Sequence, residues 1–299
     1  MFISNNIELG SAPSHPRHFV TPHRGGRLRH PQQSGLIGNT MSDTLQRADK
    51  LIVELGLAPS RVLAQKLIED GKVSYLSANG RTPVPKVSFK LSAADSIEVE
   101  DSELTRYVSR GGLKLEGALA QSAVSAANAH VLDVGQSTGG FTDCVLQQGA
   151  AKVIGVEVGQ DQLHPSLRNH PQVICLEGIN ARDLPQAQLL EYSPNGFDLI
   201  VMDVSFISQT LILPGLAPLL APSGRIVSLV KPQFEVGKDG LGKNGIVRDE
   251  KQYAVAEQRV RACCLENNLK VDAFFDSPIK GGDGNKEFFI VASLANTAN

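Results

Sequence analysis

The chain has 299 residues, a length that suits two domains better than one. Hydrophobic residues make up 41% of it and the formal net charge is -2, which allows buried cores and excludes nucleic-acid binding through overall positive charge. No run of about eighteen apolar residues is present, and no basic start precedes an apolar core, so we predict neither a membrane span nor a secretory signal. The four cysteines form no C-x-x-C pair, which favours free thiols, a cytoplasmic location and no metal.

Residues 1–40 differ in composition from the rest of the chain. They hold four of the seven histidines together with several arginines, and they show no apolar periodicity. Such a segment has too little apolar surface to bury, so we predict a disordered extension. Met41-Ser42-Asp43 is typical of a natural start, which favours an upstream extension over the alternative, a basic arm that touches RNA.

Residues 41–101 have the pattern of a compact module with two short helices and a small sheet. Apolar residues recur at helical spacing from Leu45 to Leu55, and Pro59-Ser60 begins a second helix. Short apolar alternations then predict strands at 73–75, 86–91 and 97–99.

Several details of this module resemble the S4 RNA-binding domain. The matching stretches are Arg47-Ala48-Asp49-Lys50-Leu51, Gly56-Leu57-Ala58-Pro59-Ser60-Arg61, Ala64-Gln65-Lys66-Leu67-Ile68 and Gly71-Lys72-Val73. In that family the polar face of the second helix lies against the RNA backbone. The resemblance implies phosphate contacts from Arg47, Lys50, Arg61, Gln65, Lys66 and Lys72. A solvated helix face is the alternative, because nearby acidic residues nearly balance these charges.

A linker is predicted over residues 102–110, and residues 111–295 then alternate between strand and helix. Strands are predicted at 131–135, 153–158, 173–176, 197–203, 225–230, 271–275 and 287–292. This alternation predicts a Rossmann-like α/β domain, a mostly parallel sheet covered by helices on both faces. Ligands of such sheets bind beyond the carboxyl ends of the strands, so residues that directly follow strands are expected to be neighbours.

The stretch from Val131 to Thr142 organises this domain. A buried strand is followed by a turn of small residues and by a helix that begins near Gly140. The spacing is not G-x-G-x-x-G, which disfavours a dinucleotide site. The stretch resembles the first motif of S-adenosylmethionine-dependent methyltransferases; an ordinary strand–turn–helix is the alternative. The predicted cofactor-binding residues are Asp133, Gly135, Ser137, Gly139, Glu157 at the end of the second strand, and Asn180 after the third.

Charged residues directly follow two further buried strands. Asp203 comes after four apolar residues, and Lys231 has the same position on the next strand. A charge at such a place needs a partner or a ligand, although a side chain that reaches solvent is the alternative. Lys114 is expected to point away from the apolar stripe of its helix, and Glu287 begins the last predicted strand.

Lys114, Asp203, Lys231 and Glu287 resemble, in order and context, the Lys-Asp-Lys-Glu tetrad of FtsJ-like ribose 2′-O-methyltransferases. With the S4-like module in front, residues 42–294 are similar to the TlyA family, often labelled hemolysin A, whose members methylate cytidine 2′-hydroxyls in ribosomal RNA. The resemblance implies S-adenosyl-L-methionine as cofactor, ribosomal RNA or ribosomal subunits as partner, and no membrane or metal.

The implied reaction is in-line transfer of a methyl group to a ribose oxygen, for which alignment of the two reactants is the largest expected contribution. We predict that Lys231 takes the hydroxyl proton or stabilises the oxyanion, with Asp203 and Glu287 orienting the amines. Lys114 nearby favours a neutral Lys231, whereas the carboxylates favour the charged form, and the sequence leaves this open.

Two other classes of function compete with methyl transfer. A non-catalytic ribosome-assembly factor could keep the fold, but all four tetrad residues are present. A cytolysin is suggested only by the family label, and no strongly amphipathic cationic helix supports it. The Gly/Lys loop at 237–245 is predicted either to close over RNA or to be a solvated loop.

Overall fold

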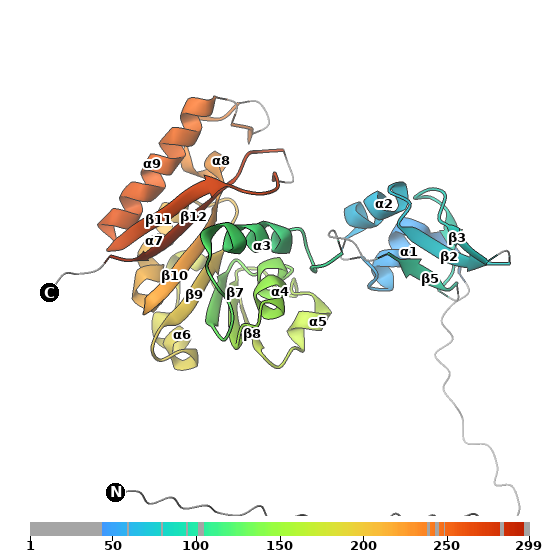
Figure 1. Ribbon diagram of the computed structural model, residues 1–299, viewed down its shortest axis with the longest axis horizontal. Coiled ribbons are helices and arrows are strands. Elements are labelled where there is room, and N and C mark those ends of the chain that lie inside the picture. Colours follow the sequence, from blue (N-terminus) through green and yellow to red (C-terminus); the bar gives the residue numbers. More distant parts are fainter. Residues whose placement is uncertain are drawn as a thin grey trace, which may run out of the picture. The chain divides into compact units, whose positions relative to one another are not determined.

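The computed structural model describes residues 44–58, 60–78, 80–93, 95–100, 105–237, 240–242, 245–247, 249–281 and 284–295. The predicted extension over residues 1–40 lies outside the described residues, as do residues 102–104 of the predicted linker and 238–239 and 243–244 of the Gly/Lys loop. Figure 1 labels the helices and strands, and the module near the N-terminus and the larger sheet domain are described separately below.

The module packs two helices against short strands. Its elements are β1 (Gln46–Arg47), α1 (Ala48–Glu54), α2 (Arg61–Glu69), β2 (Val73–Ser77), β3 (Gly80–Pro83), β4 (Lys90–Leu91) and β5 (Ile97–Val99). β1 pairs with β4, and β2 lies between β3 and β5, with every pairing antiparallel. Ser60 begins α2 as a cap, because its hydroxyl accepts a hydrogen bond from the Leu63 amide at 3.3 Å. Leu51, Ile52 and Leu67 are fully buried between these layers.

The helices of the module agree with the predicted pattern better than its strands do. α1 begins at Ala48 rather than at Leu45, because Gln46–Arg47 pairs with β4. The alternation at 86–91 is a strand only at Lys90–Leu91, since the Phe89 amide closes a turn on the Lys86 carbonyl. β3 escaped prediction because its sequence, Gly-Arg-Thr-Pro, is typical of a turn.

The larger domain is a seven-stranded sheet with the order β11-β12-β10-β9-β6-β7-β8. Its strands are β6 (His130–Val134), β7 (Lys152–Glu157), β8 (Val173–Glu177), β9 (Phe197–Met202), β10 (Leu220–Val230), β11 (Leu269–Asp276) and β12 (Phe288–Leu294). β8, β7, β6, β9 and β10 run parallel, whereas β12 is antiparallel to both of its neighbours. β12 thus lies between β10 and β11, although it is the last strand along the chain.

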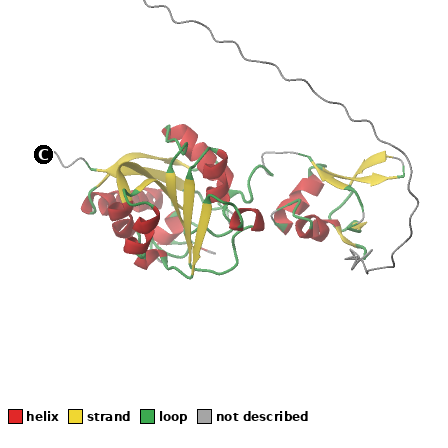
Figure 2. Ribbon diagram, turned by 90° about the horizontal axis from the view of Figure 1, so that it is seen from below, coloured by secondary structure: helices red, strands yellow, loops and turns green. Residues whose placement is uncertain are grey.

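Helices cover both faces of the sheet (Figure 2). The helical segments are α3 (Gly111–Ser122), α4 (Gly140–Gln147), α5 (Pro165–Arg168), η1 (Ala181–Asp183), α6 (Gln186–Tyr192), η2 (Gln209–Leu211), α7 (Leu213–Leu216), η3 (Ala217–Leu219), α8 (Pro232–Glu235) and α9 (Glu250–Glu266). Apolar residues of α3 and α4 pack on one face, and those of α6, α7 and α9 pack on the other. Alternate residues of each strand enter the two cores, which confirms the predicted Rossmann-like α/β fold.

Candidate active site

A cavity of about 780 Å³ lies beyond the carboxyl ends of β6, β7, β9 and β10. Seven of the residues predicted for cofactor binding or catalysis line it, namely Lys114, Gly135, Ser137, Glu157, Asn180, Asp203 and Lys231. All of them except Lys114, which comes from α3 (Gly111–Ser122), follow or end parallel strands, and the carboxyl ends of these strands share one edge of the sheet. The volume is in the range of small-molecule sites in proteins.

The turn after β6 comes very close to the neighbouring strand. Gly135 has a φ of +81°, and a Cβ added there would lie 2.7 Å from the Asp203 carbonyl oxygen. A larger residue would therefore be strained twice, by its backbone conformation and by this contact. α4 begins at Gly140 as predicted, and Gly140 lines the cavity. The first turn of α4, with its backbone N–H groups, therefore lies at the cavity wall.

Asp133 does not lie on the cavity wall. Its side chain is buried beneath the turn, where Thr142 Oγ1 donates to Oδ2 at 2.6 Å and Gln136 Nε2 donates to Thr142 at 2.9 Å. Among the described residues no donor reaches Asp133 Oδ1. Burial, with added repulsion from Asp203, raises the pKa of Asp133 to about 7. The Asp133 carboxyl therefore stabilises the turn through Thr142 and Gln136 and does not face the cavity.

Gly139 also lies away from the cavity lining, since a Cβ added there would meet Leu163 and Leu167. Glu157, in contrast, is on the wall. Its two carboxylate oxygens accept hydrogen bonds from the Ser137 and Gly159 amides, each at 2.8 Å. These bonds fix the acid against the turn and leave further lone pairs on both oxygens for a ligand. Asn180 is fixed as well, because its Oδ1 accepts from the Arg182 amide at 3.0 Å.

The predicted tetrad forms two lysine–carboxylate pairs. Lys114 Nζ donates to Glu287 Oε2 at 2.6 Å, and these side chains are 11% and 4% exposed. Lys231 Nζ lies 2.6 Å from Asp203 Oδ1 and donates to Ser205 Oγ at 2.8 Å. Lys114 lines the cavity while Leu115 and Leu119 of the same helix enter the core, and Glu287 supplies its partner from a position distant in sequence.

Phe206 is a cavity residue that the sequence analysis missed. Its side chain is 91% exposed, its φ is +66°, and its ring packs against Phe234 with centroids 5.4 Å apart. An exposed aromatic residue in the left-handed region carries a conformational cost that points to function. The only sequence signal is its position three residues after Asp203, in the loop that follows β9.

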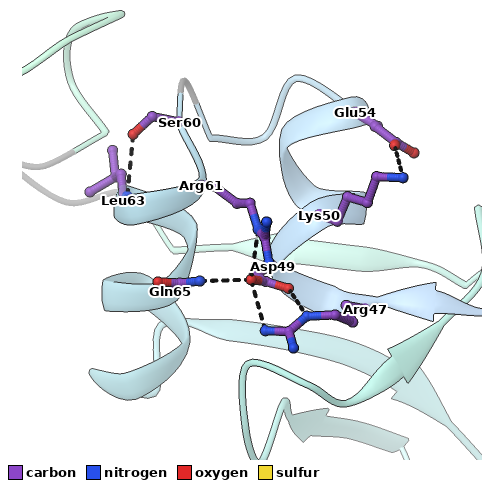
Figure 3. Close-up of polar contacts among 8 residues, drawn as sticks. All are labelled: Arg47, Asp49, Lys50, Glu54, Ser60, Arg61, Leu63 and Gln65. Atoms are coloured by element: carbon purple, nitrogen blue, oxygen red, sulfur yellow. Dashed lines mark hydrogen bonds and ion pairs between the residues drawn. The ribbon is translucent and has the colours of Figure 1, made fainter.

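The residues predicted to bind RNA divide into two kinds in the S4-like module (Figure 3). Arg47, Arg61 and Gln65 converge on the carboxylate of Asp49. The three lysines instead form single exposed ion pairs at 3.4–3.6 Å, which are Lys50–Glu54, Lys66–Asp70 and Lys72–Glu100. These three lysines therefore do not belong to the cluster that Arg47, Arg61 and Gln65 form around Asp49.

Within the parts of the chain that the structure describes, no helix is long and apolar enough to cross a membrane. No group of three or more potential His, Cys, Asp or Glu ligands gathers in them for a metal ion. All four cysteines have free thiols, and burial raises the pKa of Cys144 and of Cys264 to about 12.

The family model for FtsJ-like methyltransferases matches residues 107–294. The chain belongs to the FtsJ-like methyltransferase family. The S4 domain model matches residues 46–75, so this methyltransferase also carries an S4 domain and the recognised resemblance is confirmed.

Relatives of this FtsJ-like protein match most of its length. The 16S/23S rRNA (cytidine-2′-O)-methyltransferase TlyA of Mycobacterium tuberculosis is 40% identical over 82% of this chain and 88% of the relative. Hemolysin A of Brachyspira hyodysenteriae is 39% identical over 81% of this chain and 97% of the relative. A solved structure from Streptococcus thermophilus, named as a candidate hemolysin, has 37% identity and a TM-score of 0.64, and covers 85% of this chain and 90% of that chain.

Proposed function

We propose that this protein transfers a methyl group from S-adenosyl-L-methionine to the 2′-hydroxyl of a cytidine in ribosomal RNA, acting on ribosomal subunits in the cytoplasm. The observation that carries the proposal is the presence of two lysine–carboxylate pairs, one buried and one partly exposed, whose lysines both line one cavity next to a turn of the methyltransferase type. The relatives named as rRNA (cytidine-2′-O)-methyltransferases support the choice of substrate. The domains we propose are an S4 domain over 41–101, a linker over 102–110 and the methyltransferase domain over 111–295.

The residues on the cavity wall fit this cofactor. Glu157 keeps lone pairs that can accept hydrogen bonds from two ribose hydroxyls, and its position at the end of β7 is the one that nucleoside cofactors use in this type of sheet. Gly135 lines the cavity without a side chain, so a ligand can approach the backbone at this point of the turn. When bound, the cofactor supplies an electrophilic methyl group on a positively charged sulfur.

Lys231 is the residue we assign to the 2′-oxygen. Its amine contacts Asp203 and Ser205, which are acceptors that an ammonium group uses, and an ammonium has one more N–H to give. Lys231 so placed holds the hydroxyl and stabilises the negative charge that develops on the 2′-oxygen as the hydroxyl proton passes to solvent water. Lys114 lies on the same wall, and Glu287, which does not line the cavity, holds this second amine in position from behind.

Phe206 provides a surface for the base of the target nucleotide. Its exposed ring lies on the same cavity as Lys231, and Phe234 supports it from behind. Single-stranded or extruded nucleotides are commonly held by stacking on aromatic side chains. The S4 domain adds phosphate contacts that position the RNA without reading its sequence.

The test is methyl transfer from labelled S-adenosylmethionine to purified ribosomal subunits, followed by mapping of 2′-O-methyl sites. We expect label on a cytidine with the parent protein, and a rate about 100-fold to 10,000-fold lower with Lys231→Ala. Cofactor binding, measured by calorimetry, should persist in that variant. Absence of label on both subunits, with cofactor binding intact, would favour the non-catalytic assembly factor.

A further inference from the structure

The carboxylate of Asp49 is fully buried, yet its partners are exposed side chains of the S4 domain. Arg47 donates to it through Nε and Nη2 at 2.9 and 3.1 Å, Arg61 through Nε at 3.0 Å, and Gln65 through Nε2 at 2.8 Å (Figure 3). The Asp49 side chain is 0% exposed, whereas those of Arg47 and Arg61 are 40% and 57% exposed. A single acid therefore lies beneath two guanidinium groups at the surface.

These contacts account for the burial of a charge that would otherwise be costly. A buried carboxylate is tolerated when donors satisfy its lone pairs, and here four N–H groups do so. The hydrogen bond from Arg47, supported by those from Gln65 and Arg61, holds the pKa of Asp49 well below its usual range. Asp49 is thus a permanent anion that fixes both arginines.

The two arginines keep unused donors after this pairing. Within the described part of the module, Arg47 commits Nε and Nη2 to Asp49 and Arg61 commits only Nε, so both Nη groups of Arg61 and Nη1 of Arg47 remain for another anion. The carboxylate between them reduces the repulsion that two adjacent guanidinium groups would otherwise have. A guanidinium held by Nε has its outer edge set in one direction, which suits bidentate recognition of phosphate.

We propose that Asp49 is a positioning residue for RNA, which holds Arg47 and Arg61 as a preformed pair for the phosphate backbone. The inference rests on the proposed RNA-binding function of the S4 domain and names the group that organises it. We expect a different contribution from Lys50, Lys66 and Lys72. Each forms a single exposed ion pair, so its side chain is not held in one direction and attracts RNA by charge alone.

Positioning and charge make opposite predictions for Asp49→Asn. The substitution removes one negative charge from a phosphate-binding surface, so an effect through charge alone would tighten binding to RNA. Loss of positioning would weaken it, because the amide cannot hold two guanidinium groups as the carboxylate does. We expect the dissociation constant of the full chain for purified ribosomal subunits to rise about tenfold.

Glu98→Gln is the matched control. Glu98 is an exposed acid of the same domain that pairs with Arg81, so its replacement removes the same charge without touching the cluster. We expect binding by this variant to be unchanged or slightly tighter. If Asp49→Asn also left binding unchanged or tightened it, the inference would be overturned.

Arg61→Lys tests the inference without altering the buried acid. It keeps the positive charge but loses the Nε–H donor and the fixed outer edge, so we expect weaker binding with unchanged thermal stability. A double-mutant cycle adds a readout that a purely structural role would not give, because the effect of Asp49→Asn should disappear when Arg47 and Arg61 are both alanine. If Asp49→Asn weakened binding as much in the Arg47→Ala, Arg61→Ala background as in the parent, the inference would be contradicted.

The outcome for the arginines alone separates the two proposals. If the Arg47→Ala, Arg61→Ala double variant bound ribosomal subunits as tightly as the parent, the proposed RNA-binding role of these residues would fail. If that variant bound weakly while Asp49→Asn bound as well as the parent, only the positioning role of Asp49 would fail.

Discussion

The buried ion pair between Lys114 and Glu287 is stable only while both charged side chains are present. The side chains are almost completely buried, and each charge is compensated by the other at 2.6 Å. Removing one partner of such a pair leaves an uncompensated charge in a site of low polarity, which costs more than the pair itself contributes.

We therefore expect Lys114→Met to lower the free energy of unfolding by about 3 kcal/mol and to abolish methyl transfer. Lys270→Met is a suitable control, because the Lys270–Asp272 pair is exposed and its loss should cost less than about 1 kcal/mol. Urea unfolding of the two variants measures the difference. Equal costs would show that Glu287 finds another partner when Lys114 is lost.

Asp133 predicts a dependence of stability on pH. Its pKa is about 7 in the folded protein, above the ordinary value of 3.8 for an aspartate in an unfolded chain. A carboxyl with a raised pKa stabilises the fold below the unfolded value, and this contribution is lost as the pH rises toward 7. The parent should therefore become less stable relative to Asp133→Asn by roughly 2–3 kcal/mol between pH 5 and pH 8. If the unfolding free energies of the parent and of Asp133→Asn changed by the same amount between pH 5 and pH 8, the prediction would be contradicted.

At the scale of elements, the turn between β6 and α4 depends on the contact between Gly135 and the end of β9. Gly135→Ala should separate these strand ends, because the new Cβ would lie 2.7 Å from the Asp203 carbonyl. We expect weaker binding of S-adenosylmethionine, by about tenfold, and a lower melting temperature.

Gly178→Ala is the matched control for that turn. Gly178 also has a positive φ, of +74°, but a Cβ added there would have no atom within 4 Å. Both variants carry the backbone strain, so the difference in cofactor affinity, measured by calorimetry, reports the contact alone. Equal affinities would mean that the close approach of β6 and β9 does not shape the site.

Strands with continuous apolar runs were predictable, and residues that depend on distant partners were not. β9 and β7 were found to within a residue, because buried parallel strands have a strong sequence signal. Asp203 and Lys231 were predictable as strand-end charges, since topology brings such ends together, whereas Lys114 and Glu287 entered the tetrad through the family resemblance. The burial of Lys114 depends on Glu287, and the role of Asp49 depends on the fold of α1 against α2. Arg47 is a local neighbour of Asp49, but Arg61 and Gln65 are 12 and 16 residues away, so the sequence places Asp49 in the S4-like motif without showing that these side chains meet on it.

At the scale of the whole molecule, RNA binding and methyl transfer are assigned to different domains. Changes to the S4 domain should therefore act on a different kinetic constant from changes to the cavity. We expect the Arg47→Ala, Arg61→Ala double variant to raise KM for ribosomal subunits with little change in kcat, and Lys231→Ala to lower kcat with little change in KM. The KM of the S4 variant should also depend less on salt, by about one unit of logarithmic slope per lost phosphate contact.

The position of β12 has a consequence for the protein during its synthesis. Lys114 belongs to the first helix of the methyltransferase domain, while Glu287 comes 173 residues later, directly before the strand that inserts between β10 and β11. The residues of the turn after β6 and of the Asp203–Lys231 pair are synthesised before this strand. β12 supplies buried residues to both cores and Glu287 precedes it, so a chain that ends before β12 lacks the partner of Lys114 and the strand that joins β10 to β11.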